Sequence, residues 1–171
     1  PYVRDTVISF EAEPPTVEEM RRRIAKTLER WPWLVYEQDG RILGYAYGSE
    51  HRSRAAYAWS VDAAVYVRQG AHRKGIGRAL YSVLFPLLKL QGFFNAYAGI
   101  ALPNPGSIGL HEAMGFRSVG IYQSVGYKLG AWRDGSWWHL ALQETVPEPP
   151  PPARMEAIQQ HPEWVRILQA G

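Results

Sequence analysis

Residues 65–80, with the sequence VYVRQGAHRKGIGRAL, decide the fold. A short apolar strand, Val65–Val67, runs into a basic turn that contains glycines, and a helix follows directly from Gly75. Glycine lets the backbone approach an anion closely, and the first N–H groups of a helix have no partner within the helix. The positive end of the helix dipole and the neighbouring cations also favour negative charge. This segment therefore predicts a phosphate-binding loop between a strand and a helix.

The spacing within the loop excludes two common nucleotide-binding motifs. In a Walker A motif the lysine follows the second glycine, whereas Lys74 precedes Gly75. The third glycine of a dinucleotide-binding fingerprint is replaced by Leu80, and no acidic residue follows about twenty positions later. A basic surface turn at a helix start is the alternative interpretation. The preceding strand, the basic residues and the long following helix favour a site for a phosphate-bearing ligand.

The composition is that of one globular domain. With 171 residues, 46% of them hydrophobic and 20% charged, the chain is long enough to bury a core. A formal net charge of +3 is too small to indicate a nucleic-acid partner. Cysteine is absent, which excludes disulfides, thiolate metal sites and a cysteine nucleophile. No pair of histidines has the spacing of metal ligands, so we expect no metal.

Targeting and membrane segments are not visible in the sequence. No apolar run approaches the length of about 20 residues that a membrane span needs, and no signal segment is present. We therefore expect a cytoplasmic protein without a membrane partner. The chain begins with Pro1 instead of Met, and Tyr2–Phe10 resembles the interior of an element. This suggests that an N-terminal segment is missing or renumbered.

Helices and strands alternate along the chain, without an internal repeat. Thr16 is the expected N-cap of a helix whose apolar residues recur every fourth position, and Asp39–Gly40 is a strong hairpin turn. Pro86 should kink the helix that follows the phosphate loop, and Ser107 should cap a later, shorter helix. The expected elements are helix 17–29, strands 33–38, 41–47 and 57–68, helix 75–91, strand 96–101, helix 107–114, strands 116–127 and 136–143, a proline-rich linker at 148–152, and a terminal helix 153–169 interrupted by Pro162.

A second motif narrows the identity of the ligand. Residues 102–116, LPNPGSIGLHEAMGF, place Asn104 in a loop before a short helix that ends in Gly115 and Phe116. The basic glycine loop followed by this motif resembles the GNAT acetyltransferase superfamily. Further segments, within residues 1–143, resemble its phosphinothricin and methionine sulfoximine N-acetyltransferase branch: 10–16 (FEAEPPT), 31–35 (WPWLV), 57–62 (YAWSVD) and 125–134 (VGYKLGAWRD).

The resemblance implies an α/β fold with a mixed, strongly twisted sheet flanked by helices, in which central strands splay apart. It places the acetyltransferase domain at residues 1–146, with the N-terminal strand of the family missing or renumbered. Residues 147–171 then form a proline-rich linker and a C-terminal helix outside the resemblance.

Acetyl-CoA is the ligand that the resemblance implies. Its pyrophosphate would bind the backbone N–H groups of residues 72–77, and its pantetheine arm would run along Val65–Val67 like an added strand. Asn104 would bind a pantetheine amide. His72 departs from the family motif, which has Gln or Arg there, but backbone contacts survive that change. The expected cofactor-binding residues are Val65, Tyr66, Val67, His72, Arg73, Lys74, Gly75, Ile76, Gly77, Arg78, Asn104 and Ser107.

Asp62 and His111 are the candidate catalytic residues. Asp62 stands where related enzymes have Glu as the base that takes the proton of the amine; the alternative is a carboxylate that pins a neighbouring loop. Its shorter side chain suggests a water relay, and an ordinary pKa of about 3.9 makes it a weak base unless burial raises that value. His111 stands where many family members have Tyr. It either protonates the leaving thiolate, helps to remove the amine proton, or serves only in packing.

Arg54 and Tyr57 are the candidates for holding the acidic end of the acceptor. The guanidinium group of Arg pairs with a carboxylate or phosphinate through two N–H donors. An ordinary surface position is the alternative for Arg54. Further candidates for the acceptor pocket, each with core packing as the alternative, are Trp59, Phe10 and Tyr127.

We therefore expect an enzyme that moves acetyl from acetyl-CoA to the α-amine of a small amino acid or analogue. Phosphinothricin, methionine sulfoximine and methionine sulfone are the acceptor class, and attack is direct in a ternary complex, since no covalent carrier is evident. Backbone N–H groups near Val65–Val67 would polarise the thioester. Two alternatives stay open: acetylation of a protein N-terminus or polyamine, and a non-catalytic acyl-CoA sensor. A homodimer is expected, with Lys128 near the acceptor or at the dimer contact.

Overall fold

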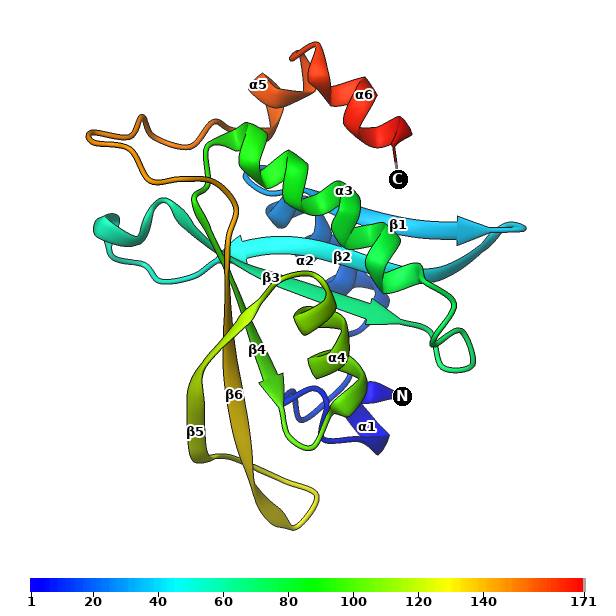
Figure 1. Ribbon diagram of the computed structural model, residues 1–171. Helices are drawn as coiled ribbons and strands as arrows, with labels where there is room; N and C mark the ends of the chain where they lie inside the picture. Colours follow the sequence, from blue (N-terminus) through cyan, green and yellow to red (C-terminus); the bar gives the residue numbers. More distant parts are fainter. Residues whose placement is uncertain (171) are drawn as a thin grey trace.

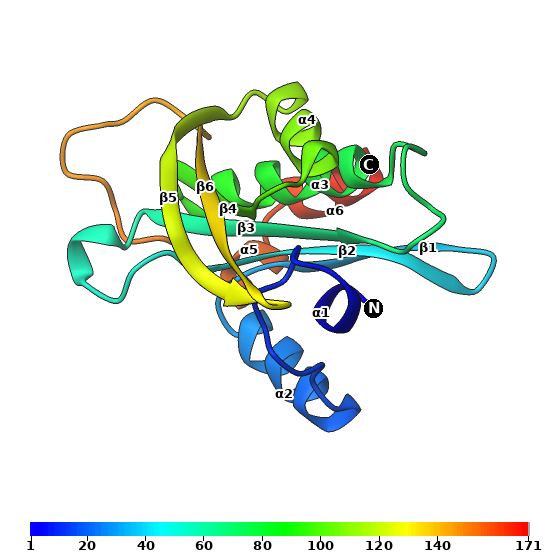
Figure 2. The same cartoon turned by 90° about the horizontal axis from the view of Figure 1, so that it is seen from below.

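The computed structural model describes residues 1–170, and its strands form a six-stranded mixed sheet in the order β1-β2-β3-β4-β6-β5. Helices α1 and α2 lie on one face of the sheet, and α3, α4 and α6 lie on the other (Figures 1 and 2). This is the mixed α/β architecture expected from the sequence. The elements are α1 Tyr2–Asp5, α2 Val17–Leu28, β1 Trp33–Gln38, β2 Arg41–Glu50, the 3-10 turn η1 Ala55–Tyr57, β3 Ser60–Val67, α3 Ile76–Gln91, β4 Asn95–Ala101, α4 Pro105–Ala113, β5 Arg117–Lys128, β6 Ala131–Ala141, α5 Met155–Gln159 and α6 Glu163–Gln169.

Helix α3 packs closely on the sheet because two glycines of β2 leave room for it. A Cβ atom at Gly44 would lie 3.0 Å from Cγ2 of Ile76, and one at Gly48 would lie 3.1 Å from Cδ2 of Leu88. Leu84 and Leu88 are fully buried in this contact. Because close-packed interiors resist displacement, these contacts hold α3 against the sheet.

Strands β3 and β4 run parallel but pair over only a short length. Their register starts at Ser60–Asn95 and, among the described residues, its last pair is Asp62–Tyr97. Beyond this pair the two strands diverge (Figure 1), whereas β3 continues to pair with β2 as far as Val67. The splayed central strands expected from the sequence are therefore present, and they leave one edge of β3 open to a ligand.

Two of the expected strands begin at different residues. The strand expected at 57–68 begins only at Ser60, because Ala55–Tyr57 form a 3-10 turn. The strand expected at 136–143 begins earlier, at Ala131, because Leu129 and Gly130 make a tight turn that joins it directly to β5. These two residues have φ angles of 50° and 76°, and the glycine supplies one of them without strain.

The C-terminal tail packs against α3. Met155 and Ile158 of α5 are buried, and the side chain of Gln91 donates a hydrogen bond of 2.9 Å to the carbonyl of Ala153. The helix expected at 153–169 is divided into α5 and α6, with Pro162 at the N-cap of the second. Pro162 interrupts the pattern as expected, because it lacks the N–H group that a continuous helix needs.

Candidate active site

A cavity of about 730 Å³ lies between the diverging strands β3 and β4 and the N-terminal ends of α3 and α4. Its wall on β3 begins at Ala63, directly after the last residue that pairs with β4. Every residue that the sequence analysis assigned to cofactor binding lines this cavity except Lys74. The cavity therefore unites the phosphate loop and the second motif, which are about 30 positions apart, in one site.

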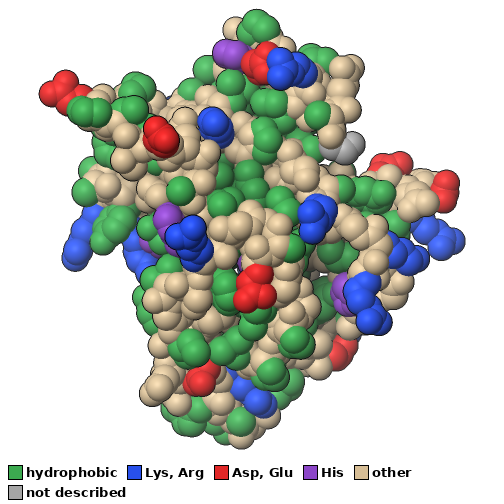
Figure 3. Space-filling view, viewed as in Figure 1, with side chains coloured by type: hydrophobic (Ala, Val, Ile, Leu, Met, Phe, Trp, Pro, Cys, Tyr) green, Lys and Arg blue, Asp and Glu red, His purple; other side chains and the backbone are tan. Residues whose placement is uncertain are grey.

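The phosphate loop presents backbone N–H groups at the start of α3. Gly75 is the N-cap, with a φ angle of 81°, and no side chain caps the helix. Arg73 also has a positive φ angle, 59°. The N–H groups of the first turn are thus left for a ligand. Lys and Arg side chains gather with a histidine over this loop at the right of Figure 3, which adds positive charge at the mouth of the cavity.

Gly77 has a packing role in the same loop. A Cβ atom at this position would lie 2.8 Å from Cδ2 of Leu110, so glycine lets α3 approach α4. The spacing of Gly75 and Gly77 thus has two separate causes, a left-handed backbone at the first residue and a helix–helix contact at the second.

The open edge of β3 is partly occupied at its end. The hydroxyl of Tyr2 donates to the carbonyl of Val67 at 2.5 Å and contacts Nε2 of His72 at the same distance. The edge from Ala63 to Tyr66 lies beyond the paired region of β4. An extended ligand arm would pair with this stretch as a strand does, which fits the pantetheine part of coenzyme A.

Asn104, not Ser107, is the N-cap of α4, which corrects the assignment made from sequence. The side-chain oxygen of Asn104 accepts a hydrogen bond of 3.2 Å from the backbone N–H of Ser107, and Pro105 occupies the first turn. Proline needs no N–H partner there, so the helix begins two residues earlier than expected. One lone pair of this oxygen is used for the cap, and the two N–H donors of the Asn104 amide are left for the cavity.

His111 is buried at the inner wall of the cavity, with both ring nitrogens in contact with a polar partner. Nδ1 lies 2.8 Å from the carbonyl of Ser107, and Nε2 lies 3.1 Å from the hydroxyl of Tyr81. A carbonyl can only accept, so Nδ1 carries the proton and Nε2 accepts from Tyr81. Burial lowers the pKa of His111, which keeps the ring neutral.

Asp62 lies at the closed end of the splay and is paired with a residue that the sequence did not single out. Nδ1 of His51 lies 2.6 Å from Oδ1 of Asp62. Burial raises the pKa of Asp62, and the hydrogen bond from His51 opposes that shift. The two residues meet because Ser49 of β2 pairs with Asp62 of β3, which places His51 just past the end of β2. In the sequence, His51 is marked as a possible site residue only by its position three residues before Arg54.

The structure separates the five residues expected around the acceptor. Tyr57 is near Asp62, since its ring meets His51 edge-on at 6.0 Å. Arg54 is exposed in the same connection. Trp59 instead donates a hydrogen bond of 2.8 Å to the carbonyl of Pro150 in the C-terminal linker. Phe10 packs on Gly126 of β5, and Tyr127 stacks edge-on against Trp132 near the β5–β6 turn.

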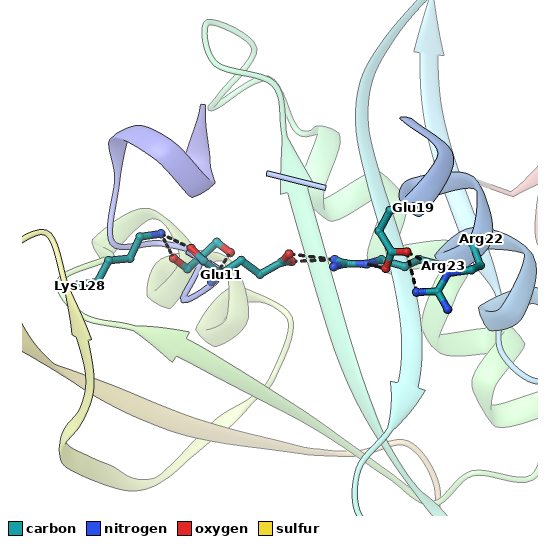
Figure 4. A network of polar contacts seen from close by, with 6 residues as sticks. Glu11, Glu19, Arg22, Arg23 and Lys128 are labelled. Atoms are coloured by element: carbon teal, nitrogen blue, oxygen red, sulfur yellow. Dashed lines mark hydrogen bonds and ion pairs between the residues drawn. The ribbon is translucent and has the colours of Figure 1, made fainter. Parts of the chain in front are cut away.

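Polar contacts hold the N-terminal segment between the β5–β6 hairpin and α2 (Figure 4). The ammonium group of Lys128 donates to the backbone carbonyls of Ser9 and Glu11. The carboxylate of Glu11 pairs with Arg23 at 2.9 Å, and Glu19 bonds the same guanidinium group. The segment from Ser9 to Glu11 is thereby fixed at both sides.

A second hollow, of about 940 Å³, lies along α2 and the aromatic side chains of β1 and β2, among them Tyr45 and Tyr47. It shares only Tyr2, Tyr66 and Val67 with the first cavity, and it is lined neither by His111 nor by the start of α3, whereas Asp62 lines neither hollow. We therefore assign the active site to the cavity between β3 and β4. Within residues 1–170 no group of acidic, histidine or cysteine side chains has the arrangement of a metal site. In the same residues, no helix has the length and apolar character needed to cross a membrane.

An open strand edge beside an uncapped helix N-terminus defines a protein that binds a long, phosphate-bearing ligand between two strands. Comparison with known proteins identifies the family. The model of the acetyltransferase (GNAT) domain matches residues 2–137. A phosphinothricin N-acetyltransferase of Streptomyces coelicolor is 43% identical over 145 residues, which cover 82% of this chain and 85% of that protein. The L-methionine sulfoximine/L-methionine sulfone acetyltransferase of Salmonella typhimurium is 36% identical over 120 residues, 70% of each chain.

Solved structures agree with this result. The crystal structure of a GNAT superfamily phosphinothricin acetyltransferase from Sinorhizobium meliloti in complex with acetyl-CoA superposes with a TM-score of 0.82 at 35% identity, covering 87% of this chain and 82% of that one. The chain therefore belongs to the GNAT family of acetyltransferases, enzymes that use acetyl-CoA as the acetyl donor. It is an N-acetyltransferase, and both the fold and the family expected from the sequence are confirmed.

Proposed function

We propose that the protein acetylates the α-amine of a small amino acid or analogue of the phosphinothricin, methionine sulfoximine or methionine sulfone class. The observation that carries the proposal is its 43% and 36% identity to two enzymes named for these acceptors. The cavity supplies the donor side of the reaction, and the His51–Asp62 pair lies next to Ala63, the first β3 residue of its wall. Attack by the amine is direct, in a ternary complex.

The donor site is divided between backbone and side chains. The N–H groups of residues 72–77 and the cations Arg73 and Arg78 bind the pyrophosphate, with Lys74 at the rim. The open edge of β3 holds the pantetheine arm, and Asn104 donates to one of its carbonyl groups. Backbone N–H groups of β3 near Val65 polarise the thioester carbonyl as negative charge develops on it.

The ammonium group of the acceptor loses its proton near Asp62. An ammonium group has no lone pair, so it must lose a proton before it can attack. The carboxylate is held in place by His51, at the residue where β3 and β4 separate. No cysteine is available to carry the acetyl group, which favours direct transfer. His111 supports the cavity wall, because both of its ring nitrogens already have partners.

The acidic end of the acceptor binds at the connection between β2 and β3. Arg54 is exposed there and Tyr57 borders the His51–Asp62 pair. A guanidinium group matches the geometry of a carboxylate or phosphinate. A polyamine would instead meet the positive charge of Arg52 and Arg54, which disfavours it as the acceptor.

We also propose that the enzyme is a homodimer formed through β5 and β6. Large apolar side chains are more than half exposed along this hairpin (Figure 3, lower part), and contiguous exposed apolar surface is typical of a protein interface. These residues are Val119, Ile121, Tyr127, Leu129 and Trp132.

The experiment that tests the proposed function is a measurement of CoA thiol release with acetyl-CoA and a panel of amines. We expect turnover with phosphinothricin, methionine sulfoximine or methionine sulfone. Turnover only with polyamines or with peptides would replace the proposed acceptor class. Binding of acetyl-CoA without turnover of any amine would identify a sensor instead.

A further inference from the structure

An imidazole and a carboxylate form a close pair at the point where β3 and β4 separate, next to the residue at which the cavity begins. Nδ1 of His51 lies 2.6 Å from Oδ1 of Asp62, although the two residues come from different elements. The side chain of His51 is 10% exposed and that of Asp62 is 27% exposed, so both are largely withdrawn from water. A hydrogen bond to an ionised group in such a place is stronger than one at the surface.

Aromatic rings fix the orientation of His51. Its ring stacks on Tyr97 of β4, with centroids 4.3 Å apart and planes inclined by 13°. Tyr57 and Trp137 each meet it edge-on at 6.0 Å. The imidazole is thus held on three sides, and the bond to Asp62 fixes which nitrogen faces the carboxylate.

The second ring nitrogen of His51 is left available. Among residues 1–170, Nε2 makes no hydrogen bond, and it is not one of the buried side-chain atoms that lack a partner, so it reaches solvent. An ionised carboxylate only accepts, so Nδ1 carries a proton, and in the neutral ring Nε2 presents its lone pair. This is the arrangement in which a carboxylate orients a histidine that acts as a base.

The pair lies beside the start of the cavity. Asp62 and Tyr97 form the last pair of the β3–β4 register, and the next residue, Ala63, lines the cavity. Side chains alternate along a strand, so Asp62 lies on the face opposite Ala63, which is buried in the core. His51 and Asp62 do not line the cavity themselves, and they lie next to its first β3 residue, on the face of the sheet that the core does not fill.

We propose that His51 takes the proton of the acceptor ammonium through Nε2, and that Asp62 is the positioning residue that holds Nδ1–H. This inference rests on the proposed function, since it names the base of the same reaction. Loss of one proton to His51 gives a neutral amine, whose lone pair forms the N–C bond. The C–S bond then breaks, the thiolate leaves with the electron pair, and it takes the second proton of the amine. His51 returns its proton to solvent.

An imidazole suits this step better than the carboxylate alone. One oxygen of Asp62 is already engaged by His51, and carboxylates are weak bases, whereas imidazoles titrate near neutral pH. The charged or titratable groups that face His51 are Asp62 of β3, Tyr97 of β4, Tyr57 of the 3-10 turn and the neighbouring Arg52.

The substitution His51→Asn separates catalysis from loop anchoring. The side-chain amide of Asn places a donor where Nδ1 stands, so the bond to Asp62 is retained while Nε2 is lost. We expect kcat at pH 7 to fall by about 100-fold, the usual contribution of a general base, with an unchanged KM for acetyl-CoA. The residual rate should rise tenfold per pH unit as the free amine accumulates. A wild-type kcat for His51→Asn would overturn the inference and leave His51 as an anchor only.

The matched control is His139→Gln on β6. Nε2 of His139 lies 2.8 Å from Oδ1 of Asn95, and the amide nitrogen of Gln can replace that contact. We expect kcat within about twofold of wild type. If this variant loses as much activity as His51→Asn, the loss reflects disturbance of the sheet and the inference fails.

A second readout does not depend on the acceptor. Nitrogen-15 NMR of the free protein at pH 7.5 should show His51 as the Nδ1–H tautomer, and Asp62→Asn should abolish that preference. An Nε2–H tautomer in the wild-type protein would overturn the inference. Failure of the proposed function has a different signature, because then no α-amine in the panel is acetylated by the wild-type enzyme.

Discussion

The hydroxyl of Tyr81 lies 3.1 Å from Nε2 of His111, and this contact joins α3 to α4 behind the cofactor cavity. Tyr81 is fully buried, and burial raises its pKa, so its hydroxyl stays protonated and donates. The ring of Tyr81 also stacks on Phe85, which fixes the donor in place. Two cavity walls are therefore connected by one polar contact in an apolar setting.

Removing this donor should destabilise the protein. Tyr81→Phe leaves Nε2 of His111 buried without a partner, and such a loss costs about 1–3 kcal/mol in the free energy of unfolding. Urea denaturation measures the change. Tyr122→Phe is the control, since Tyr122 is about half exposed and should lose less than about 0.5 kcal/mol. Equal stability of Tyr81→Phe and wild type would show that the contact contributes nothing.

The buried side chain of His111 should make the stability of the protein depend on pH. Burial lowers the pKa of His111, so the unfolded chain binds the proton more readily than the folded protein. Its contribution to stability is full above the unfolded pKa of about 6.5 and is lost as the pH falls below that value. We expect the free energy of unfolding to decrease between pH 7.5 and 5.0, with a smaller slope in His111→Asn. An unchanged slope in that variant would contradict the assignment.

Gly75 is the position in the phosphate loop where an added side chain should cost most. Its φ angle of 81° is unfavourable for an L side chain, although a Cβ atom there would meet nothing within 4 Å. Gly75→Ala should lose about 1–2 kcal/mol of stability and raise the KM for acetyl-CoA, because the loop relaxes away from the anion. Gly120→Ala has equal space and no positive φ angle, and it should change neither quantity. Acetyl-CoA titrations on both variants measure the difference.

Local chemistry explains what could be predicted from the sequence. The phosphate loop, the hairpin turn at Asp39–Gly40 and the cap at Thr16 depend on neighbouring residues, and each is present in the structure. The sequence predicts the N-cap of α4 at Ser107, whereas the structure has it at Asn104. Both residue types are good N-caps, and only the backbone conformation decides which of them caps the helix.

Long-range register explains what could not be predicted. His51 and Asp62 are 11 positions apart and meet only because β2 and β3 pair with Ser49 opposite Asp62. Trp59 bonds to Pro150, 91 positions away, in a tail that lies outside the recognised motifs. The periodicity of a single strand carries no information about which residue of another strand faces it.

Lys128 should control the affinity for the acceptor through the N-terminal segment. Lys128→Met removes the donors to Ser9 and Glu11, so the backbone of the segment loses this anchor to β5 while the Glu11–Arg23 ion pair is kept. If Phe10 belongs to the acceptor pocket, as the sequence predicts, we expect a several-fold rise in the KM for the amine and no change in the KM for acetyl-CoA, because Phe10 then moves away from β5. Steady-state kinetics with each substrate varied in turn measure this. The exposed Arg117→Met is the control, and an equal effect in that variant would attribute the change to net charge.

Dimerisation through β5 and β6 should be broken by charge on the hairpin. Val119 and Ile121 are 61% and 57% exposed, and burying them in an interface would remove apolar surface from water. Val119→Lys combined with Ile121→Lys would place ammonium groups in that interface at a cost of several kcal/mol. Light scattering after gel filtration should give twice 19.4 kDa for wild type and 19.4 kDa for the double variant.

Val165→Lys on α6 is the control for added charge, because Val165 is 56% exposed but lies far along the chain from the hairpin. It should remain dimeric. A monomeric wild type would remove the proposed interface altogether. A dimeric double variant would place the contact elsewhere on the surface. Two unpaired ammonium groups buried in an apolar interface would weaken it.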